Sequence, residues 1–326
     1  MRYILGVDLG GTNIVVGAVA EDGSAVHGVI NAPTNAEAGA DAIAERIAQL
    51  CRASLAEAER GAGVKRRDVV GIGVGAPGPL DRAGGMVLIA PNLGWHDYPL
   101  RQKVSDAVGL PVALDNDANC AVYGEWWVGA GRGSRYLVGL TIGTGIGGGI
   151  VVDGKLYHGA TDVAGEVGHM TIDSTGRRCK CGNYGCLEAY ASGPNIAARA
   201  VEGIEAGVET RLPTYTDGDL ARITAQTVYQ AAHDGDEFAL EVVRDTAKIL
   251  GAGVANLLNI FNPDVVVILG GVTLAGDSLF VPLQAEVTRR AFKPAVKACR
   301  ILPGELPGTA GVVGAARVFL DQEQRA

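Results

Sequence analysis

The sequence predicts an α/β fold assembled from two similar halves, and three observations support this. A layout of strand, glycine-rich turn, strand and Asp-Gly turn occurs twice, at residues 3–23 and 136–156. Strand-like and helix-like segments alternate along the chain, which is typical of α/β proteins. Glycine is abundant, with 48 of 326 residues, and its clusters adjoin β-branched runs. The clusters therefore indicate places where the backbone turns tightly or approaches another group closely.

The first half begins with two apolar runs, "YILGVDLGG" and "NIVVGAVAEDG", which we expect to be strands joined by a glycine-rich turn. Asp22-Gly23 is a strong turn signal after the second run. Further expected elements are an alanine-rich amphipathic helix at about 36–60 and strands at 69–79 and 111–119.

The second half repeats the strand pair at 136–145 and 146–156, ending in Asp153-Gly154. A long helix is expected at 237–261, because apolar residues recur there at helical spacing: Phe238, Val242, Ala247, Leu250, Val254 and Leu257. Asn262-Pro263-Asp264 should end it, before a buried strand at 265–271 and a closing helix at 309–320. We place the domain boundary near 115–125, giving a smaller domain at 1–118, completed by helix 309–326, and a larger one at 119–308.

Composition and charge describe a soluble globular protein. The chain is 48% hydrophobic and 20% charged, with a net charge of −8, and its one basic triplet is "KRR" at 65–67. This argues against binding of nucleic acid through bulk positive charge. No signal peptide or run of 18 apolar residues is present, so we expect a cytoplasmic protein with reduced thiols and no membrane partner. Cys51, Cys120 and Cys299 are expected to be core residues.

The glycine motif "GTGIGG" at 143–148 matches the dinucleotide pattern, but the chain continues as a strand where that pattern requires a helix. A Walker A loop is absent. Two Gly/Thr turns remain, at 8–12 and 141–145, and they could serve as turns only. Their occurrence as a matched pair favours binding of phosphate oxygens by backbone amides and hydroxyls. Asp8 is then well placed to hold Mg²⁺ through water.

Seven motifs stand in a specific order: "DLGGT", "GVGAPGP", "DNDAN", "TIGTGIGGGI", "GEVGH", "CKCGNYGCLE" and "LGG". In this order they resemble the ROK family of sugar kinases and sugar-sensing repressors, within the actin/hexokinase superfamily. The likeness covers nearly the whole chain and looks strongest to the bacterial ATP-dependent glucokinases of that family. It implies two actin/hexokinase-like (ribonuclease H-like) α/β domains with an active-site cleft between them.

The segment "ALDNDANCA" at 113–121 ends an apolar strand in two acids and two amides. Strand ends carry catalytic groups in α/β folds, but the segment could equally be a strand-to-helix turn with Asp117 as N-cap. The resemblance implies that Asp117 is the general base, taking a proton from the 6-hydroxyl of glucose as that oxygen attacks the γ-phosphorus of ATP with Mg²⁺ present. It also implies that Asn116 binds the sugar.

Further roles follow from the resemblance alone. Glu166, His169 and Glu188 would bind sugar hydroxyls, and Gly78 and Asn92 would lie near the sugar. The nucleotide would be held by Asp8, Gly10, Gly11, Thr12, Thr141, Gly143, Thr144 and Gly145, with Gly270 and Gly271 against its adenine or ribose. One departure concerns Asn13, because the family commonly has lysine at this position; the change removes a cation near the phosphates.

Three of the six cysteines, Cys179, Cys181 and Cys186, fall within eight residues. Reduced surface thiols are one interpretation, but clustering on a glycine-containing loop disfavours it. Three thiolates need a fourth ligand for tetrahedral zinc, and His169 lies upstream. Cys₃His is a closed set that leaves no position for water, so the zinc would be structural. The resemblance implies the same four ligands, and such a site would clamp the loop carrying Glu166 and Glu188.

Two alternatives to glucokinase remain at this point. One is a kinase for another hexose, namely N-acetylglucosamine, N-acetylmannosamine, mannose or fructose. The other is a sugar-responsive repressor, which we disfavour because "DLGGT" starts at residue 8 and leaves no room for a preceding DNA-binding domain. The resemblance further implies a homodimer or homotetramer. The acidic net charge leads us to expect that the protein binds no nucleic acid.

Overall fold

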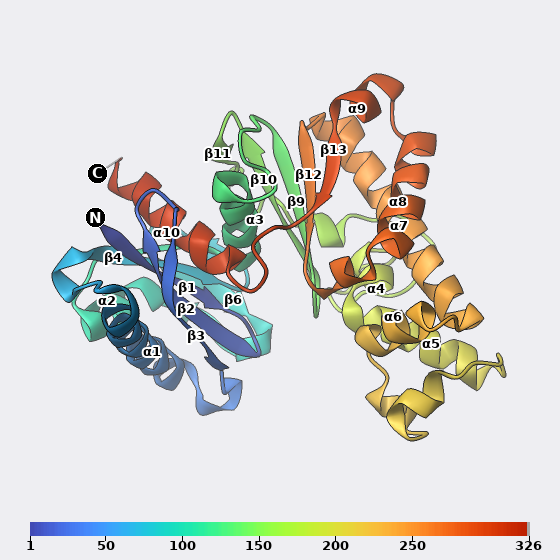
Figure 1. Cartoon of the computed structure of the whole chain (residues 1–326), viewed down its shortest axis with the longest axis horizontal. Helices are drawn as coiled ribbons and strands as arrows, with labels where there is room; N and C mark the ends of the chain where they lie inside the picture. The colour runs from blue at the N-terminus through green and yellow to red at the C-terminus, as the bar shows by residue number, and fades with distance from the viewer. Residues whose placement is uncertain (325–326) are drawn as a thin grey trace. The chain divides into compact units, whose positions relative to one another are not determined.

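The computed structural model describes residues 1–324 and divides them into two compact units (Figure 1). Unit 1 comprises Met1–Ser134, Gly149–Gly165 and the chain from Glu305 onwards, and unit 2 comprises Arg135–Gly148 and Glu166–Gly304. The chain therefore passes between the units four times. The C-terminal segment lies with the N-terminal part of the chain, as in the expected domains, whereas residues 119–134 and 149–165 belong to unit 1 and not to the larger domain expected at 119–308.

Unit 1 is built on a five-stranded sheet in the order β3-β2-β1-β4-β8. Its strands are β1 (Tyr3–Leu9), β2 (Asn13–Ala20), β3 (Val26–Pro33), β4 (Val69–Ala76) and β8 (Val112–Asn116). Strands β1, β2 and β3 form an antiparallel meander, whereas β1, β4 and β8 run parallel to one another. The expected strand pair around the first glycine turn is thus present.

Four helices belong to unit 1: α1 (Ala40–Ala62), α2 (Leu100–Val108), α3 (Asp117–Val128) and α10 (Ala310–Glu323). Helix α1 packs on β2 and β3, and α10 packs on α3, β1 and β4 although it comes from the other end of the sequence (Figure 1). This packing explains why α3 and α10 share a unit, and hence why unit 1 does not end at residue 118.

Glycines in the strands allow α10 to lie directly on the sheet. A Cβ atom at Gly6 or Gly73 would overlap the backbone of α10, and one at Gly71 would overlap the ring of Phe319. Because side chains alternate along a strand, the neighbouring Leu5 and Val7 face the opposite side and join the buried core with α1. The high glycine content of these strands therefore has a packing cause.

Short strands complete unit 1 and begin the second sheet. Strands β5 (Leu80–Asp81), β6 (Met86–Ala90) and β7 (Trp95–Tyr98) form a small antiparallel sheet. The second five-stranded sheet has the order β11-β10-β9-β12-β13. Its strands are β9 (Leu137–Ile142), β10 (Ile146–Val152), β11 (Lys155–Leu156), β12 (Val265–Leu269) and β13 (Arg300–Pro303). Strands β9, β12 and β13 are parallel, as are three strands of the first sheet.

The helices of unit 2 are α4 (Glu188–Ala191), α5 (Gly193–Glu205), α6 (Ala225–His233), α7 (Glu237–Phe261), α8 (Asp277–Arg290) and α9 (Lys293–Ala298). Helix α7 has the expected bounds. Its N-terminus is capped by Asp236, which accepts a hydrogen bond from the Ala239 amide at 2.8 Å, and it ends where Asn262 adopts a φ of 46°. Its apolar residues pack with β12 and α8 in the core of the unit.

Single 3₁₀ turns connect these elements: η1 (Ala36–Ala38), η2 (Arg66–Asp68), η3 (Pro91–Leu93), η4 (Val167–His169), η5 (Leu212–Thr216), η6 (Leu220–Arg222) and η7 (Gly271–Ala275). None of the helices within residues 1–324 combines the length and apolar character needed to cross a membrane. The α/β class and the repeated layout predicted from the sequence are confirmed.

Candidate active site

The carboxyl ends of three parallel strands bring the first group of candidate residues together in unit 1. Asp8 on β1 is in register with Gly75 on β4, which is in register with Asp115 on β8. Asn116 ends β8, and Asp117 begins α3. Ligands commonly bind at this edge of parallel sheets. The structure thus brings Asp8 and the "DNDAN" segment to the same end of the sheet.

Asp8 has an unusual protonation equilibrium. Burial, together with the negative charge of Asp117, raises its pKa to about 7. Two mutually repelling carboxylates supply the hard oxygen ligands that Mg²⁺ prefers, so these residues fit the expected magnesium ion. A Cβ atom at Gly311 of α10 would overlap the Asp8 carboxylate, which shows how closely α10 approaches this group.

The junction between β8 and α3 fixes Asp117. Asn116 is the N-cap of α3 and accepts a hydrogen bond from the Asn119 amide at 3.1 Å. Asp117 therefore occupies the first helical position, and the alternative interpretation of Asp117 as N-cap is wrong. Its Oδ1 accepts a hydrogen bond from the Ala118 amide at 2.8 Å. Because the helix is capped by another residue, the carboxylate of Asp117 is not required for that task.

The first glycine turn is held by backbone contacts that leave its tip exposed. The Gly10 amide donates to the Asn13 carbonyl at 2.9 Å, and the hydroxyl of Thr34 donates to the Gly10 carbonyl at 2.7 Å. Gly11 and Thr12 are exposed. A Cβ atom at Gly11 would lie 3.4 Å from that of Asn92, so the structure brings this turn next to an expected sugar-binding residue.

Gly78 is in a different situation from the turn glycines. Its φ of 93° is in the region that favours glycine, and a Cβ atom there would overlap the Ile89 carbonyl. The backbone conformation between β4 and the small sheet β5-β6-β7 therefore requires glycine at this position. This requirement is independent of any contact with a sugar.

The second glycine turn, in unit 2, is connected to Gly193 and to two expected site residues, Glu188 and Gly270. The Gly143 carbonyl accepts a hydrogen bond from the Gly193 amide at 2.9 Å, and the Ile146 amide donates to Oε2 of Glu188 at 2.8 Å. Gly270 has a φ of 100°, and a Cβ atom there would overlap the backbone of Ile142. Gly143 and Thr144 are exposed at the tip of this turn.

The cysteine segment forms a compact group of potential ligand atoms with His169. Ligand atoms of His169, Cys179, Cys181 and Cys186 all lie within 4.8 Å of one another. The Sγ atoms of Cys181 and Cys186 are 3.7 Å apart, and Cys179 Sγ is 3.8 Å from His169 Nδ1. Tetrahedral zinc, with Zn–S of about 2.3 Å and Zn–N of about 2.0–2.1 Å, requires ligand separations of about 3.6–3.8 Å. The four residues therefore fit zinc.

Glu188 lies between this cluster and the second glycine turn. Its Oε1 is 3.7 Å from Cys179 Sγ, while its Oε2 accepts the Ile146 amide hydrogen at 2.8 Å. Glu166 precedes η4, where the His169 amide donates to its carbonyl at 3.1 Å. The expected sugar-binding residues of unit 2 are thus attached directly to the cysteine cluster.

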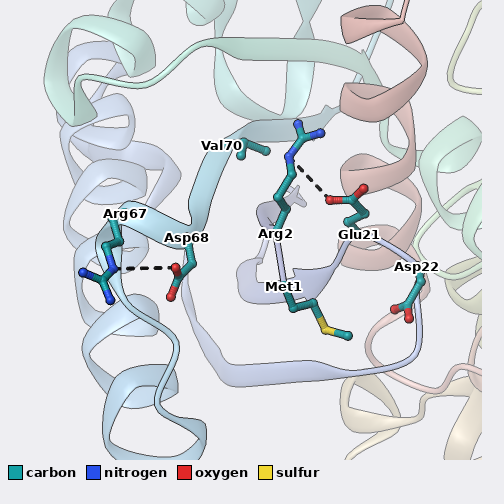
Figure 2. Close-up of a pocket in the computed structure, with 7 residues that line it drawn as sticks. All are labelled: Met1, Arg2, Glu21, Asp22, Arg67, Asp68 and Val70. Carbon is teal, nitrogen blue, oxygen red and sulfur yellow. Dashed lines mark ion pairs between the residues drawn. The ribbon is translucent and has the colours of Figure 1, made fainter.

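One hollow in the described structure lies away from these residues. A cavity of about 560 Å³ is lined by Met1, Arg2, Glu21, Asp22, Arg67, Asp68 and Val70 (Figure 2). It lies at the amino ends of β1 and β4, the opposite end of the sheet from Asp8 and Asp117. Two ion pairs lie within it, Arg2 with Glu21 at 3.4 Å and Arg67 with Asp68 at 4.0 Å. We do not assign this hollow to catalysis.

Two residues near this edge of the first sheet were not identified from the sequence. Arg82 and His158 both contact the buried carboxylate of Asp115, at 2.9 and 2.8 Å. Each is a single polar residue outside the seven motifs, and only their convergence in space marks them.

Comparisons with known proteins agree with this architecture. A family model described as the ROK family matches residues 4–322. A glucokinase from Halalkalibacterium halodurans is 39% identical over 99% of this chain and 96% of its own. A solved ROK glucokinase from Streptomyces griseus, in complex with glucose and AMPPNP, superposes with a TM-score of 0.82 at 36% identity, covering 97% of this chain and 98% of that one. A putative xylose repressor from a Caldicellulosiruptor species is 38% identical over 85% of this chain and 69% of its own.

Proposed function

Since the chain belongs to the ROK family, we propose that it is an ATP-dependent glucokinase, which transfers the γ-phosphoryl group of ATP to the 6-hydroxyl of glucose. The observation that carries this proposal is the position of Asp117 beside Asp8 at the carboxyl edge of the sheet. The similarity to glucokinases along nearly the whole chain supports the choice of sugar.

In the proposed reaction, Asp117 accepts the proton of the 6-hydroxyl and orients its oxygen. Phosphoryl transfer depends mainly on positioning and on neutralisation of phosphate charge. Bound Mg²⁺ would supply part of that neutralisation, and Asp8 is the residue proposed to hold it. Backbone amides and hydroxyls at the exposed tips of the turns 8–12 and 141–145 would bind phosphate oxygens, and Gly270 and Gly271 would contact the adenosine.

Amide, imidazole and carboxylate groups are proposed to bind glucose hydroxyls. They belong to Asn116, Glu166, His169 and Glu188, with Asn92 and Gly78 nearby. Carboxylates suit the task because each accepts hydrogen bonds from adjacent hydroxyls.

The group of Cys179, Cys181, Cys186 and His169 is proposed to hold structural zinc. Its four protein ligands would complete a tetrahedral shell, so no coordination position would remain for substrate. The consequence for the reaction is mechanical: Glu188 and Glu166 lie on the segments that this metal would fix in place.

We further propose that the enzyme acts in the cytoplasm, where thiols stay reduced, and assembles as a homodimer or homotetramer. Sedimentation of the purified protein at several concentrations tests the assembly: a monomer at micromolar concentration would rule it out.

The test of the proposed function is ADP release with ATP and a panel of glucose, N-acetylglucosamine, N-acetylmannosamine, mannose and fructose. We expect kcat/KM for glucose to exceed that of every other sugar by at least about tenfold, the smallest preference that clear pocket discrimination gives. Preference for another sugar would reassign the substrate, and turnover of none would refute kinase activity.

A repressor is the second candidate, since a putative xylose repressor is 38% identical to the chain. The net charge of −8 disfavours it. Sugar-dependent retardation of operator-like duplex DNA at physiological salt would favour the repressor over the kinase.

A further inference from the structure

A buried ionic cluster lies directly behind the proposed catalytic base. The Asp115 side chain is fully buried, and its Oδ2 lies 2.9 Å from Nε of Arg82 and 2.8 Å from Nε2 of His158. Arg82 and His158 are themselves largely buried, with 17% and 15% of their side chains exposed. A carboxylate removed from water requires such partners, because an unpaired buried charge is strongly unfavourable.

The second oxygen of the same carboxylate holds the strand-to-helix junction. Oδ1 of Asp115 accepts a hydrogen bond from the Asn116 amide at 2.8 Å and from Nδ2 of Asn119 at 3.2 Å. Asn116 in turn caps α3, whose first residue is Asp117. Each oxygen of Asp115 thus has two partners. The two contacts of Oδ1 hold Asn116 and Asn119, which lie before and after Asp117 in the chain.

The two partners of Oδ2, Arg82 and His158, come from distant parts of unit 1. Arg82 follows β5, and His158 follows β11. Asp162 also links these two residues. Its Oδ2 accepts a hydrogen bond from the Arg82 amide at 3.3 Å. Asp162 lies on the same loop as His158, and this loop is closed by a hydrogen bond from the Ala164 amide to the His158 carbonyl at 3.1 Å. The cluster therefore ties two separate segments, the chain at Arg82 and the loop 158–164, to the start of α3.

The space beside the cluster is too small for a substrate. A cavity of about 20 Å³ is lined by Arg82, Asp115, His158 and neighbouring residues, which is room for about one water molecule. Neither a sugar nor a nucleotide fits into this space. Any effect of Arg82 and His158 on the reaction should therefore pass through Asp115.

We propose that Arg82 and His158 are positioning residues for the phosphoryl transfer: through Asp115 they hold the start of α3 so that Asp117 meets the sugar hydroxyl in the correct orientation. The inference rests on the proposed function. Misplacement of a catalytic group by about 1 Å costs on the order of 10²-fold in rate, so loosening this junction should reduce kcat with little effect on nucleotide binding.

The experiment compares His158→Leu, which removes the hydrogen-bonding ring, with His158→Gln, which keeps an N–H group at similar reach. Arg82→Met removes the guanidinium group, and Arg52→Met is the matched control, since Arg52 pairs with Glu45 on the exposed face of α1. We measure kcat and both KM values well below each melting temperature. Hydrogen exchange of the segment 112–123 reports on the junction itself.

We expect His158→Leu and Arg82→Met to lower kcat by at least about tenfold, with KM for ATP within about threefold of wild type. His158→Gln and Arg52→Met should stay within about threefold in kcat. Exchange in segment 112–123 should rise in the two damaging variants only.

The decisive arm repeats His158→Leu in an Asp117→Asn background. If His158 acts through Asp117, its removal should lower the residual kcat by less than about threefold there, because the coupled loss has already occurred. An equal fold-loss of kcat in the wild-type and Asp117→Asn backgrounds would show a purely structural role for the cluster and would overturn the proposal. The proposal is also overturned if the wild type is active and the His158→Leu variant keeps the same kcat. Wild-type protein that phosphorylates no sugar overturns the proposed function instead.

Discussion

Replacing Asp117 by Asn should separate its chemical role from its structural one. The substitution keeps the shape of the side chain, and an amide oxygen can still accept the hydrogen bond that the Ala118 amide donates at 2.8 Å. The cap of α3 belongs to Asn116 and is not altered. We therefore expect a folded protein with a melting temperature close to that of wild type.

The expected loss lies in the rate of turnover. A positioned general base contributes about 10²–10⁴-fold, so kcat should fall by that factor, which corresponds to about 2.7–5.5 kcal/mol in activation free energy. The affinity for glucose should change by less than about threefold, because an amide still offers one acceptor and one donor. Loss of the Asp117 charge should also lower the pKa of Asp8, since that charge, after burial, is what raises it.

The assay is ADP release at saturating glucose and ATP, with glucose affinity measured separately by calorimetry. Asp106→Asn on the exposed face of α2 is the control, because Asp106 accepts only a local hydrogen bond from Gln102 at 2.7 Å. A folded Asp117→Asn variant that loses less than tenfold in kcat would refute the assignment of the base. A large loss of glucose affinity would show that the carboxylate acts mainly in binding.

Three further outcomes are expected. Cys181→Ser should remove bound zinc and raise KM for glucose at least about tenfold, since mutating even the residues that support metal ligands costs about 10–100-fold in metal affinity or activity. Metal content is measured by mass spectrometry beside KM. Gly311→Ala should lower kcat/KM for ATP about tenfold or more, because the new methyl group would displace the Asp8 carboxylate. Hydrogen bonding by Arg289 lowers the pKa of Glu286 from 4.5 to about 2, so its carboxylate stabilises the fold above pH 4.5 and loses this contribution as pH falls through 2. After screening by solvent, Glu286→Gln should cost about 1–2 kcal/mol in urea unfolding at pH 7, and the difference from wild type should shrink toward pH 2.

Each of these has its own control. Cys299→Ser should keep both zinc and KM, because Cys299 lies outside the cluster; zinc retained by Cys181→Ser would contradict the ligand assignment. Gly61→Ala on α1 should leave kcat/KM unchanged, and an equal loss there would show that the effect is general. If the difference in unfolding free energy between wild type and Glu286→Gln stays constant from pH 7 to pH 3, the account of Glu286 is refuted.

Local patterns in the sequence were sufficient for several elements. The apolar spacing between Glu237 and Phe261 and the Asn-Pro pair after it predicted α7 to the residue, because helix propensity, periodicity and capping depend on neighbours a few positions away. The turn glycines and the spacing of Cys179, Cys181 and Cys186 were equally visible. Such short-range features also carry the resemblance to the ROK family, which the family match over residues 4–322 confirms.

Only the tertiary structure decided how distant segments combine. It placed α3 in the same unit as α10, because α3 packs on that helix and Gly6 and Gly73 let the helix lie on the sheet. No pattern near residue 118 encodes such packing. It gave the cap of α3 to Asn116, and it brought Arg82 and His158 to the carboxylate of Asp115. The physical reason is that a sequence records only which residues are neighbours along the chain. The partners of a buried charge depend instead on strand order and on the close packing of segments that are far apart in the chain.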